Sequence, residues 1–110
     1  MREFIIPIAI GILATQAEAQ TALLCSQPPT SVLEITKACV IDDARRLERS
    51  KESAESIATA AIVNCETMFS PARDYYRRCY DPDSYKKLVA TADRILRQIA
   101  VTEVVNVRAK

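Results

Sequence analysis

Four cysteines, Cys25, Cys39, Cys65 and Cys79, are the residues of this sequence with the clearest capacity for chemistry. Their spacings are 14, 26 and 14 residues, so the outer pair and the inner pair share one midpoint, at Glu52. A chain that folds back on itself near Glu52 brings each cysteine opposite its partner. The spacing therefore predicts two nested disulfides, Cys25 with Cys79 and Cys39 with Cys65.

The other pairings conflict with geometry. Four cysteines allow three connectivities. Joining Cys65 to Cys79 would bridge about 21 Å along one helical arm, whereas a disulfide holds two Cα atoms about 4.4–6.8 Å apart. A crossed pairing would require two hairpin registers at once. Only the nested arrangement remains.

Zinc binding and redox catalysis are the competing uses of these cysteines. A zinc site uses closely spaced ligands, often including histidine, but the chain has no histidine and no cysteine pair closer than 14 residues. A redox enzyme of the usual kind would carry a Cys-x-x-Cys motif, which is absent. We therefore expect no metal and no cofactor, and we interpret both bridges as structural.

Other catalytic groups are scarce. Without histidine there is no ordinary base near neutral pH, and the only glycine, Gly11, lies near the N-terminus, which excludes glycine-rich phosphate loops further along the chain. Serine with lysine remains formally possible, as does a pair of carboxylates. The carboxylate candidates are Asp42, Asp43, Glu48 and Glu66. Nothing in the pattern gathers them around a cleft, so we expect a protein that is not an enzyme and keep a small hydrolase as the weakest alternative.

One stretch mixes aromatic and basic residues, Tyr75-Tyr76-Arg77-Arg78-Cys79-Tyr80, and is followed by Lys86 and Lys87. Such a mixture can bind an anionic surface or polymer through charge and cation–π contacts. The candidate partner-binding residues are Arg77, Arg78, Lys86 and Lys87. The competing and favoured interpretation is that the tyrosines cover the outer disulfide while the arginines are solvated.

Residues 1–19 have the pattern of a signal peptide. Arg2 precedes an apolar run from Phe4 to Leu13, and Ala17-Glu18-Ala19 places small residues where a signal peptidase needs them. The run is shorter than the roughly 20 residues of a membrane span, and Leu24 before Cys25 does not fit a lipobox. We expect cleavage before Gln20, a periplasmic or secreted protein whose disulfides suit that compartment, and no stable membrane insertion afterwards.

The net charge argues against polyanions as partners. Loss of the expected signal peptide changes the net charge of +1 by a single unit, too little to create the field that attracts polyanions. We therefore expect no nucleic acid as partner.

After a leader at residues 20–30, a single helical domain is expected over residues 31–110. Ser31 and Glu34 match a capping box for a first helix that extends to about Arg49. One broad face of this helix contains Val32, Leu33, Ile35, Cys39, Val40, Ala44 and Leu47. Asp43 falls on the same face and is expected to pair with Arg46.

A second helix is expected after a turn at residues 50–53, where Ser50 or Ser53 can serve as the cap. Basic residues precede this turn and acidic residues follow it, as the helix dipoles favour. The helix carries a seam of small and apolar residues spaced by four and three: Ala54, Ala58, Ala61, Cys65, Met68 and Ala72. Ser70-Pro71 either kinks the helix or restarts it.

A third helix is expected after Asp81-Pro82-Asp83, with Asp81 or Asp83 as its cap. Its apolar stripe consists of Tyr85, Leu88, Val89, Ala92, Ile95, Leu96 and Ile99. The tail from Val101 to Val107 is rich in valine and leaves the stripe. It could be helix, strand or disordered. The favoured interpretation is a frayed or self-packed helix end, and the alternatives are that it adds a strand to a partner or packs across a dimer.

The segment from Cys39 to Cys65, with its alanine-rich second arm, resembles small exported helical proteins of proteobacteria that carry a similarly spaced cysteine pair. The resemblance covers about half of the expected mature chain and implies no activity. The sequence thus predicts an all-α, three-helix, disulfide-tied domain. We expect it to be a non-enzymatic binding or accessory protein, such as an inhibitor, an immunity-like protein or an envelope interaction module, with a protein of the cell envelope as partner.

Overall fold

The computed structural model describes residues 22–110; the expected signal peptide lies outside them. Within this range the protein is all-helical, as the sequence predicts, but with four α-helices instead of three. The elements are α2 (Thr30–Leu47), a 3₁₀ turn η2 (Glu48–Ser50), α3 (Ala54–Asn64), α4 (Glu66–Cys79) and α5 (Pro82–Arg108).

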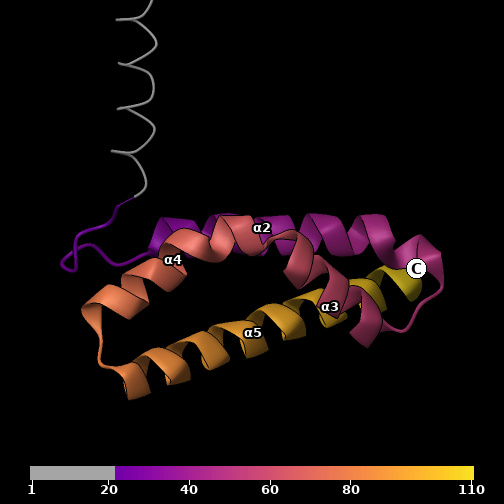
Figure 1. Ribbon diagram of the computed structural model, residues 1–110. Helices are drawn as coiled ribbons and strands as arrows, with labels where there is room; N and C mark the ends of the chain where they lie inside the picture. The colour runs from indigo at the N-terminus through magenta and orange to yellow at the C-terminus, as the bar shows by residue number, and fades with distance from the viewer. Residues whose placement is uncertain (1–21) are drawn as a thin grey trace, which may run out of the picture.

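The helices form a bundle in which α2 and α5 are the long elements (Figure 1). Helix α2 contacts α3, α4 and α5, and α5 also contacts α3 and α4. The end of α5 is held on the end of α2 because Arg45 pairs with Glu103 at 2.6 Å and Arg108 donates to the carbonyl of Glu48 at 3.0 Å. The bundle is thus closed at the C-terminal end of α5.

The core consists mainly of small and medium-sized side chains contributed by all four helices. Its buried members are Val40, Ala44, Ile57, Ala58, Ala61, Cys65, Phe69, Ala72, Tyr75, Tyr76, Leu96, Ala100 and Val104. Buried alanines allow the close helix approach that a disulfide across the hairpin requires. The buried hydroxyl of Thr36 donates to the carbonyl of Val32 at 2.8 Å, which satisfies it within its own helix.

Both predicted disulfides are confirmed. Cys39 and Cys65 join α2 to the α3–α4 junction with their Cα atoms 6.0 Å apart, and Cys25 joins Cys79 at 5.6 Å. The hairpin turn is also confirmed, with Ser53 accepting a hydrogen bond from the amide of Ser56 at 3.1 Å. Lys51 takes the left-handed conformation here, with φ of 67°, a role that glycine usually fills.

The start of α2 differs from the prediction. The helix begins at Thr30 with Pro29 as its cap residue, and no side chain caps it. The carbonyl of the buried Pro29 accepts from the amide of Leu33, so Ser31 already lies inside the first turn and the capping box does not form. The predicted apolar face is also rotated, because Ile35 is 55% exposed while Thr36 is buried. The pairing of Asp43 with Arg46 is confirmed.

The second predicted helix is two helices, and it breaks at Cys65 rather than at Pro71. Cys65 has φ of −101° and ψ of 10°, outside the usual helical range, whereas Pro71 lies inside α4. The seam changes at this break, since Met68 is 46% exposed and Phe69 is buried instead. The disulfide to α2 holds Cys65 in place while the chain changes direction there. At the start of α4 the buried position is therefore one residue later than the predicted seam.

Helix α5 contains the valine tail. Asp81 caps it by accepting from the amide of Ser84 at 3.1 Å, Pro82 follows at the first position, and the helix continues to Arg108. Val104 is fully buried, so the tail is part of the core. No helix within residues 22–110 is long and apolar enough to cross a membrane.

Candidate functional site

A groove of about 460 Å³ lies between α4 and α5, and a concave, mostly apolar site of this kind is where a ligand or partner segment is expected to bind. Its lining comes from all four helices and the residue between α3 and α4: Thr36, Val40, Ile62, Cys65, Glu66, Phe69, Arg73, Tyr85, Lys86, Val89, Ala90, Asp93 and Leu96. The sequence prediction did not identify this groove.

The break at Cys65 positions the groove. Helix α3 packs extensively on α5, but after the break α4 follows α2 and makes fewer contacts with α5. Figure 1 shows α5 diverging from α2 toward its own start, where a short loop joins it to the end of α4. Ile62 at the end of α3 and Phe69 at the start of α4 therefore line the same groove from either side of the break.

The floor of the groove is apolar and well packed. Val40 is fully buried, and Phe69 and Leu96 are buried with only a small exposed fraction. Val89 and Tyr85 on α5 are partly buried against the same core. The floor is thus rigid, and any ligand would meet aliphatic and aromatic surface there.

Charged side chains form the rim. Arg73 donates two hydrogen bonds to Glu66, at 3.1 and 3.0 Å, and its guanidinium lies 5.1 Å from the centre of the Phe69 ring. Burial is the largest single influence on Arg73 and lowers its pKa, but the interactions with Glu66 and Tyr85 together outweigh it, so the pKa of Arg73 is raised. Asp93 pairs with Arg97 at 3.7 Å. Lys86 is the remaining charged residue of the lining, and it forms no ion pair with any described residue.

A smaller hollow of about 200 Å³ lies between α2 and α5, with Tyr76 of α4 in its wall. Its lining is largely apolar: Leu33, Lys37, Tyr76, Leu88, Thr91, Ala92, Ile95 and Leu96. Leu96 lines both hollows, so one α5 side chain lies between them. Burial raises the pKa of the Tyr76 hydroxyl, with smaller contributions from Tyr80 and Tyr75.

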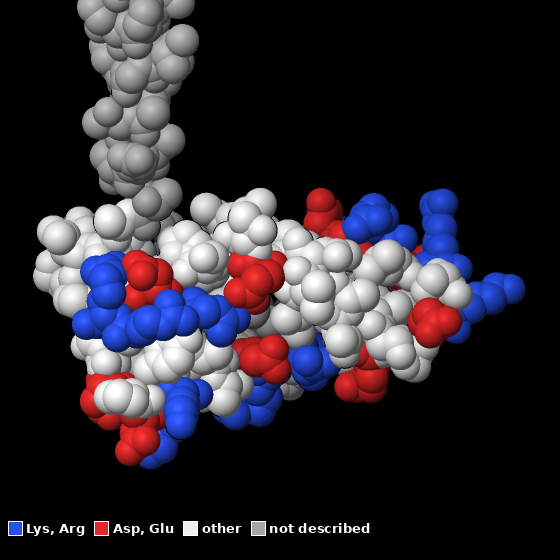
Figure 2. Space-filling view, viewed as in Figure 1, with Lys and Arg blue, Asp and Glu red and all other residues white. Residues whose placement is uncertain are grey.

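The four basic residues singled out from the sequence do not form one uniform patch. Arg77 donates to the Tyr85 hydroxyl at 3.0 Å, and Arg78 binds Asp74 and the leader. Lys86 lines the groove, whereas Lys87 is exposed outside it. Figure 2 shows basic side chains next to acidic ones over this end of the molecule.

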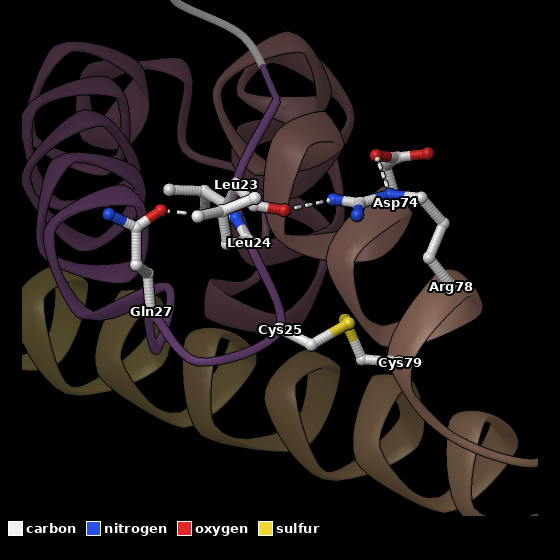
Figure 3. Close-up of polar contacts among 7 residues, drawn as sticks. All are labelled: Leu23, Leu24, Cys25, Gln27, Asp74, Arg78 and Cys79. Carbon is white, nitrogen blue, oxygen red and sulfur yellow. Dashed lines mark hydrogen bonds and ion pairs between the residues drawn. A yellow bond between two sulfur atoms is a disulfide. The ribbon is translucent and has the colours of Figure 1, made fainter.

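The leader is tied to α4 as the tyrosine pattern suggests. The hydroxyl of the buried Tyr75 donates to the carbonyl of Cys25 at 2.9 Å. Arg78 donates to the carbonyl of Leu23 at 2.7 Å and to Asp74 at 2.8 Å, beside the Cys25–Cys79 bridge (Figure 3). These contacts fix a short segment outside the helices onto the last turns of α4.

The carboxylates considered for catalysis are dispersed along α2, η2 and α4. Asp43 is bound by Arg46 and by the side-chain amide of Asn64, and Glu66 is bound by Arg73. Among residues 22–110 no group of three histidine, cysteine or acidic side chains is placed to hold a metal ion. The groove remains as the candidate site.

Sequence reasoning missed the groove because its floor residues have the same pattern as core residues. Ile62, Phe69, Val89 and Leu96 all occupy apolar positions of helical stripes. The groove between them depends on the direction that α4 takes after Cys65 relative to α5. Comparison of the chain with protein-family models, with curated proteins and with solved structures finds no match.

Proposed function

We propose that this chain is a non-enzymatic binding protein of the periplasm or the secreted fraction, acting as an inhibitor, an immunity-like protein or an envelope accessory protein. Its partner is a protein of the cell envelope, and the groove between α4 and α5 receives an amphipathic helix of that partner. The groove, with its apolar floor and charged rim, is the observation on which the proposal rests.

The chemistry of the rim favours a protein segment over a simple lipid chain. Protein interfaces combine an apolar centre with a polar rim, and the rim here carries both signs, with Glu66 and Asp93 beside Arg73 and Lys86. An amphipathic helix lays apolar side chains into such a groove and offers charges of both signs at its edges. Lys86 gives the partner an unpaired cation to meet, so an acidic side chain is expected there.

The two disulfides support the extracytoplasmic setting, because such bridges persist in oxidising compartments. The engagement of Asp43 and Glu66 in ion pairs supports a role in binding instead of catalysis. A broad hydrolase screen on the oxidised protein is expected to find no turnover, and a reproducible activity abolished by one carboxylate substitution would contradict this part of the proposal.

The first experiment identifies the partner from a defined position. A photoreactive lysine analogue replaces Lys86 at the groove in one variant and Lys51 at the hairpin turn in the other, and both are crosslinked in living cells. We expect a discrete crosslinked protein from position 86 that is absent from position 51. Equal products from both positions would show that the groove does not direct the contact.

The second experiment tests occupancy of the groove. Ala90 is an exposed groove residue, and Ala38 is an exposed alanine of α2 outside it. With the crosslinked segment made as a peptide, Ala90→Trp is expected to weaken binding at least tenfold by filling the groove, while Ala38→Trp leaves it unchanged. Titration calorimetry measures both. Unchanged binding to the Ala90→Trp protein would contradict the proposed site.

A second candidate function is binding to an anionic surface through Arg77, Arg78, Lys86 and Lys87. Lys86 and Lys87 favour it, because both are exposed and neither forms an ion pair within residues 22–110. It predicts salt-sensitive retention on an anionic matrix that is lost when both lysines are replaced by glutamate. Retention independent of salt would exclude this function.

A further inference from the structure

We propose that the Cys25–Cys79 bridge is a site of thiol–disulfide exchange, which dithiol proteins of the same compartment can open, while the Cys39–Cys65 bridge is protected. Opening it releases residues 22–28 of the leader from α4, while the buried Pro29 stays at the start of α2. None of these residues lines the groove, and the proposal does not depend on the proposed function.

Access is the first difference between the two bridges. Exchange requires a thiolate to reach one sulfur of the disulfide. Cys25 is an exposed residue in a segment outside the helices, whereas Cys65 is only 1% exposed at the α3–α4 junction. Cys39 and Cys79 are both partly buried, so the difference in access lies between Cys25 and Cys65. A protein-sized reductant can therefore approach Cys25 far more easily than either sulfur of the inner bridge.

The second difference is what holds each pair of sulfurs together once the bond is broken. The inner cysteines belong to α2 and to the packed junction of α3 and α4, so their sulfurs stay close and the bond re-forms readily. Apart from the bridge, Cys25 and its neighbours are held by the hydrogen bonds from Tyr75 to the carbonyl of Cys25 and from Arg78 to the carbonyl of Leu23 (Figure 3), and by the packing of the Leu23 side chain against the core. The leader can therefore move away after reduction, and the outer bridge stays open.

The exchange is balanced by the second thiol of the reductant. A reductant thiolate attacks Sγ of Cys25, the bond between the two protein sulfurs breaks, and Cys79 leaves as a thiolate that takes a proton from water. The second reductant thiolate then attacks its partner sulfur in the mixed disulfide and releases Cys25, which is also protonated. The protein gains two electrons and two protons, and the reductant becomes a disulfide.

The test is graded reduction of the fully oxidised chain. Reduced thioredoxin and, separately, dithiothreitol are added, the reaction is stopped by alkylation at intervals, and peptides are identified by mass spectrometry. We expect Cys25 and Cys79 to be alkylated at least tenfold faster than Cys39 and Cys65 with both reductants. Opening of the inner bridge first or opening of both bridges together overturns the proposal. If dithiothreitol opens the outer bridge and reduced thioredoxin does not, the assignment of the reaction to dithiol proteins is overturned.

A paired variant tests the role of the leader contacts. Tyr75→Phe combined with Arg78→Gln removes both hydrogen bonds to the leader and keeps both disulfides, so the outer bridge is expected to open faster while the inner rate stays unchanged. Amide exchange of residues 22–28 should rise on selective reduction, while that of α2 and α5 does not. An unchanged leader after reduction would show that the bridge does not control its release.

Discussion

At the ends of these helices, residues other than glycine form the turn and the caps. The described chain contains no glycine, and the left-handed position at the hairpin turn is occupied by Lys51. Side-chain caps then start the next elements, Ser53 for α3 and Asp81 for α5. Each cap supplies an acceptor to amides that the first helical turn leaves free.

The Asp81 cap gives the chain a defined acid sensitivity. Hydrogen bonds from the hydroxyl and the amide of Ser84 lower the pKa of Asp81 below its ordinary value of 3.8. Because the folded pKa is depressed, the stabilisation is present above the unfolded pKa and is lost as the pH falls through the folded value.

Asp81→Asn keeps an acceptor but removes this titration. We expect the thermal midpoint of the natural chain to exceed that of the variant near neutral pH, and the gap to close as the pH falls below about 4. Calorimetry across this range measures it. A gap that does not change with pH would show that the ionised carboxylate contributes nothing to the cap.

The caps also show what can be predicted from sequence at this scale. The sequence left two candidate caps at each of these helix starts, Ser50 or Ser53 and Asp81 or Asp83, and the structure uses Ser53 and Asp81. Ser31 failed although it matches a capping box, because the carbonyl of the buried Pro29 already accepts the first helical bond and the helix starts before Ser31. A local motif cannot reveal which neighbouring residue tertiary packing will bury.

At the scale of the elements, the α3–α4 break and the length of α5 are the results that sequence patterns left undecided. Pro71 is the stronger breaker by composition, yet the helix breaks at Cys65, where a bond to α2 fixes the chain. The valine tail has strand-like composition, yet it is helical because Val104 fits against the core at the closed end of the bundle. In both cases tertiary contacts override local preference.

The valine tail can be tested with two neighbouring substitutions. Val104 is fully buried and Val105 is 53% exposed, so Val104→Asp buries a charge while Val105→Asp does not, at equal cost in helix propensity. We expect Val104→Asp to lower the free energy of unfolding by more than about 3 kcal/mol and Val105→Asp by about 0.5 kcal/mol.

Urea denaturation followed by circular dichroism compares these two variants with the natural chain. Equal effects of the two substitutions would place the tail outside the core.

At the scale of the whole molecule, the inner disulfide and the groove belong to one arrangement. The bridge fixes α2 against the α3–α4 junction, and the change of direction there separates α4 from α5. The hairpin and both bridges were predictable because cysteine spacing and turn charges agree. The groove was not, since it depends on the direction of a helix after a break that no residue pattern marks.

Removal of the inner bridge is expected to destabilise the whole fold. The double substitution Cys39→Ser and Cys65→Ser removes a bridge between residues 26 apart in sequence. The unfolded chain then gains conformational entropy, and on the chain-entropy model the free energy of unfolding falls by about 3.5 kcal/mol. Urea titration measures this loss of unfolding free energy, and the double variant Cys25→Ser and Cys79→Ser is measured for comparison. A loss below about 1 kcal/mol would show that the packed helices alone fix the junction.

The nested order of the bridges has a consequence for biosynthesis. Cysteines leave the ribosome in chain order, so Cys25 and Cys39 become available together before either native partner has been made. Oxidation at that stage would join the wrong pair. Early formation of α2 opposes this error, because Cys39 then lies about 14 Å along the helix from Thr30, and the five residues from Cys25 to Thr30 would have to fold back along the helix almost fully extended to reach it. The first helix thus restricts the wrong pairing and favours the correct one once Cys65 and Cys79 arrive.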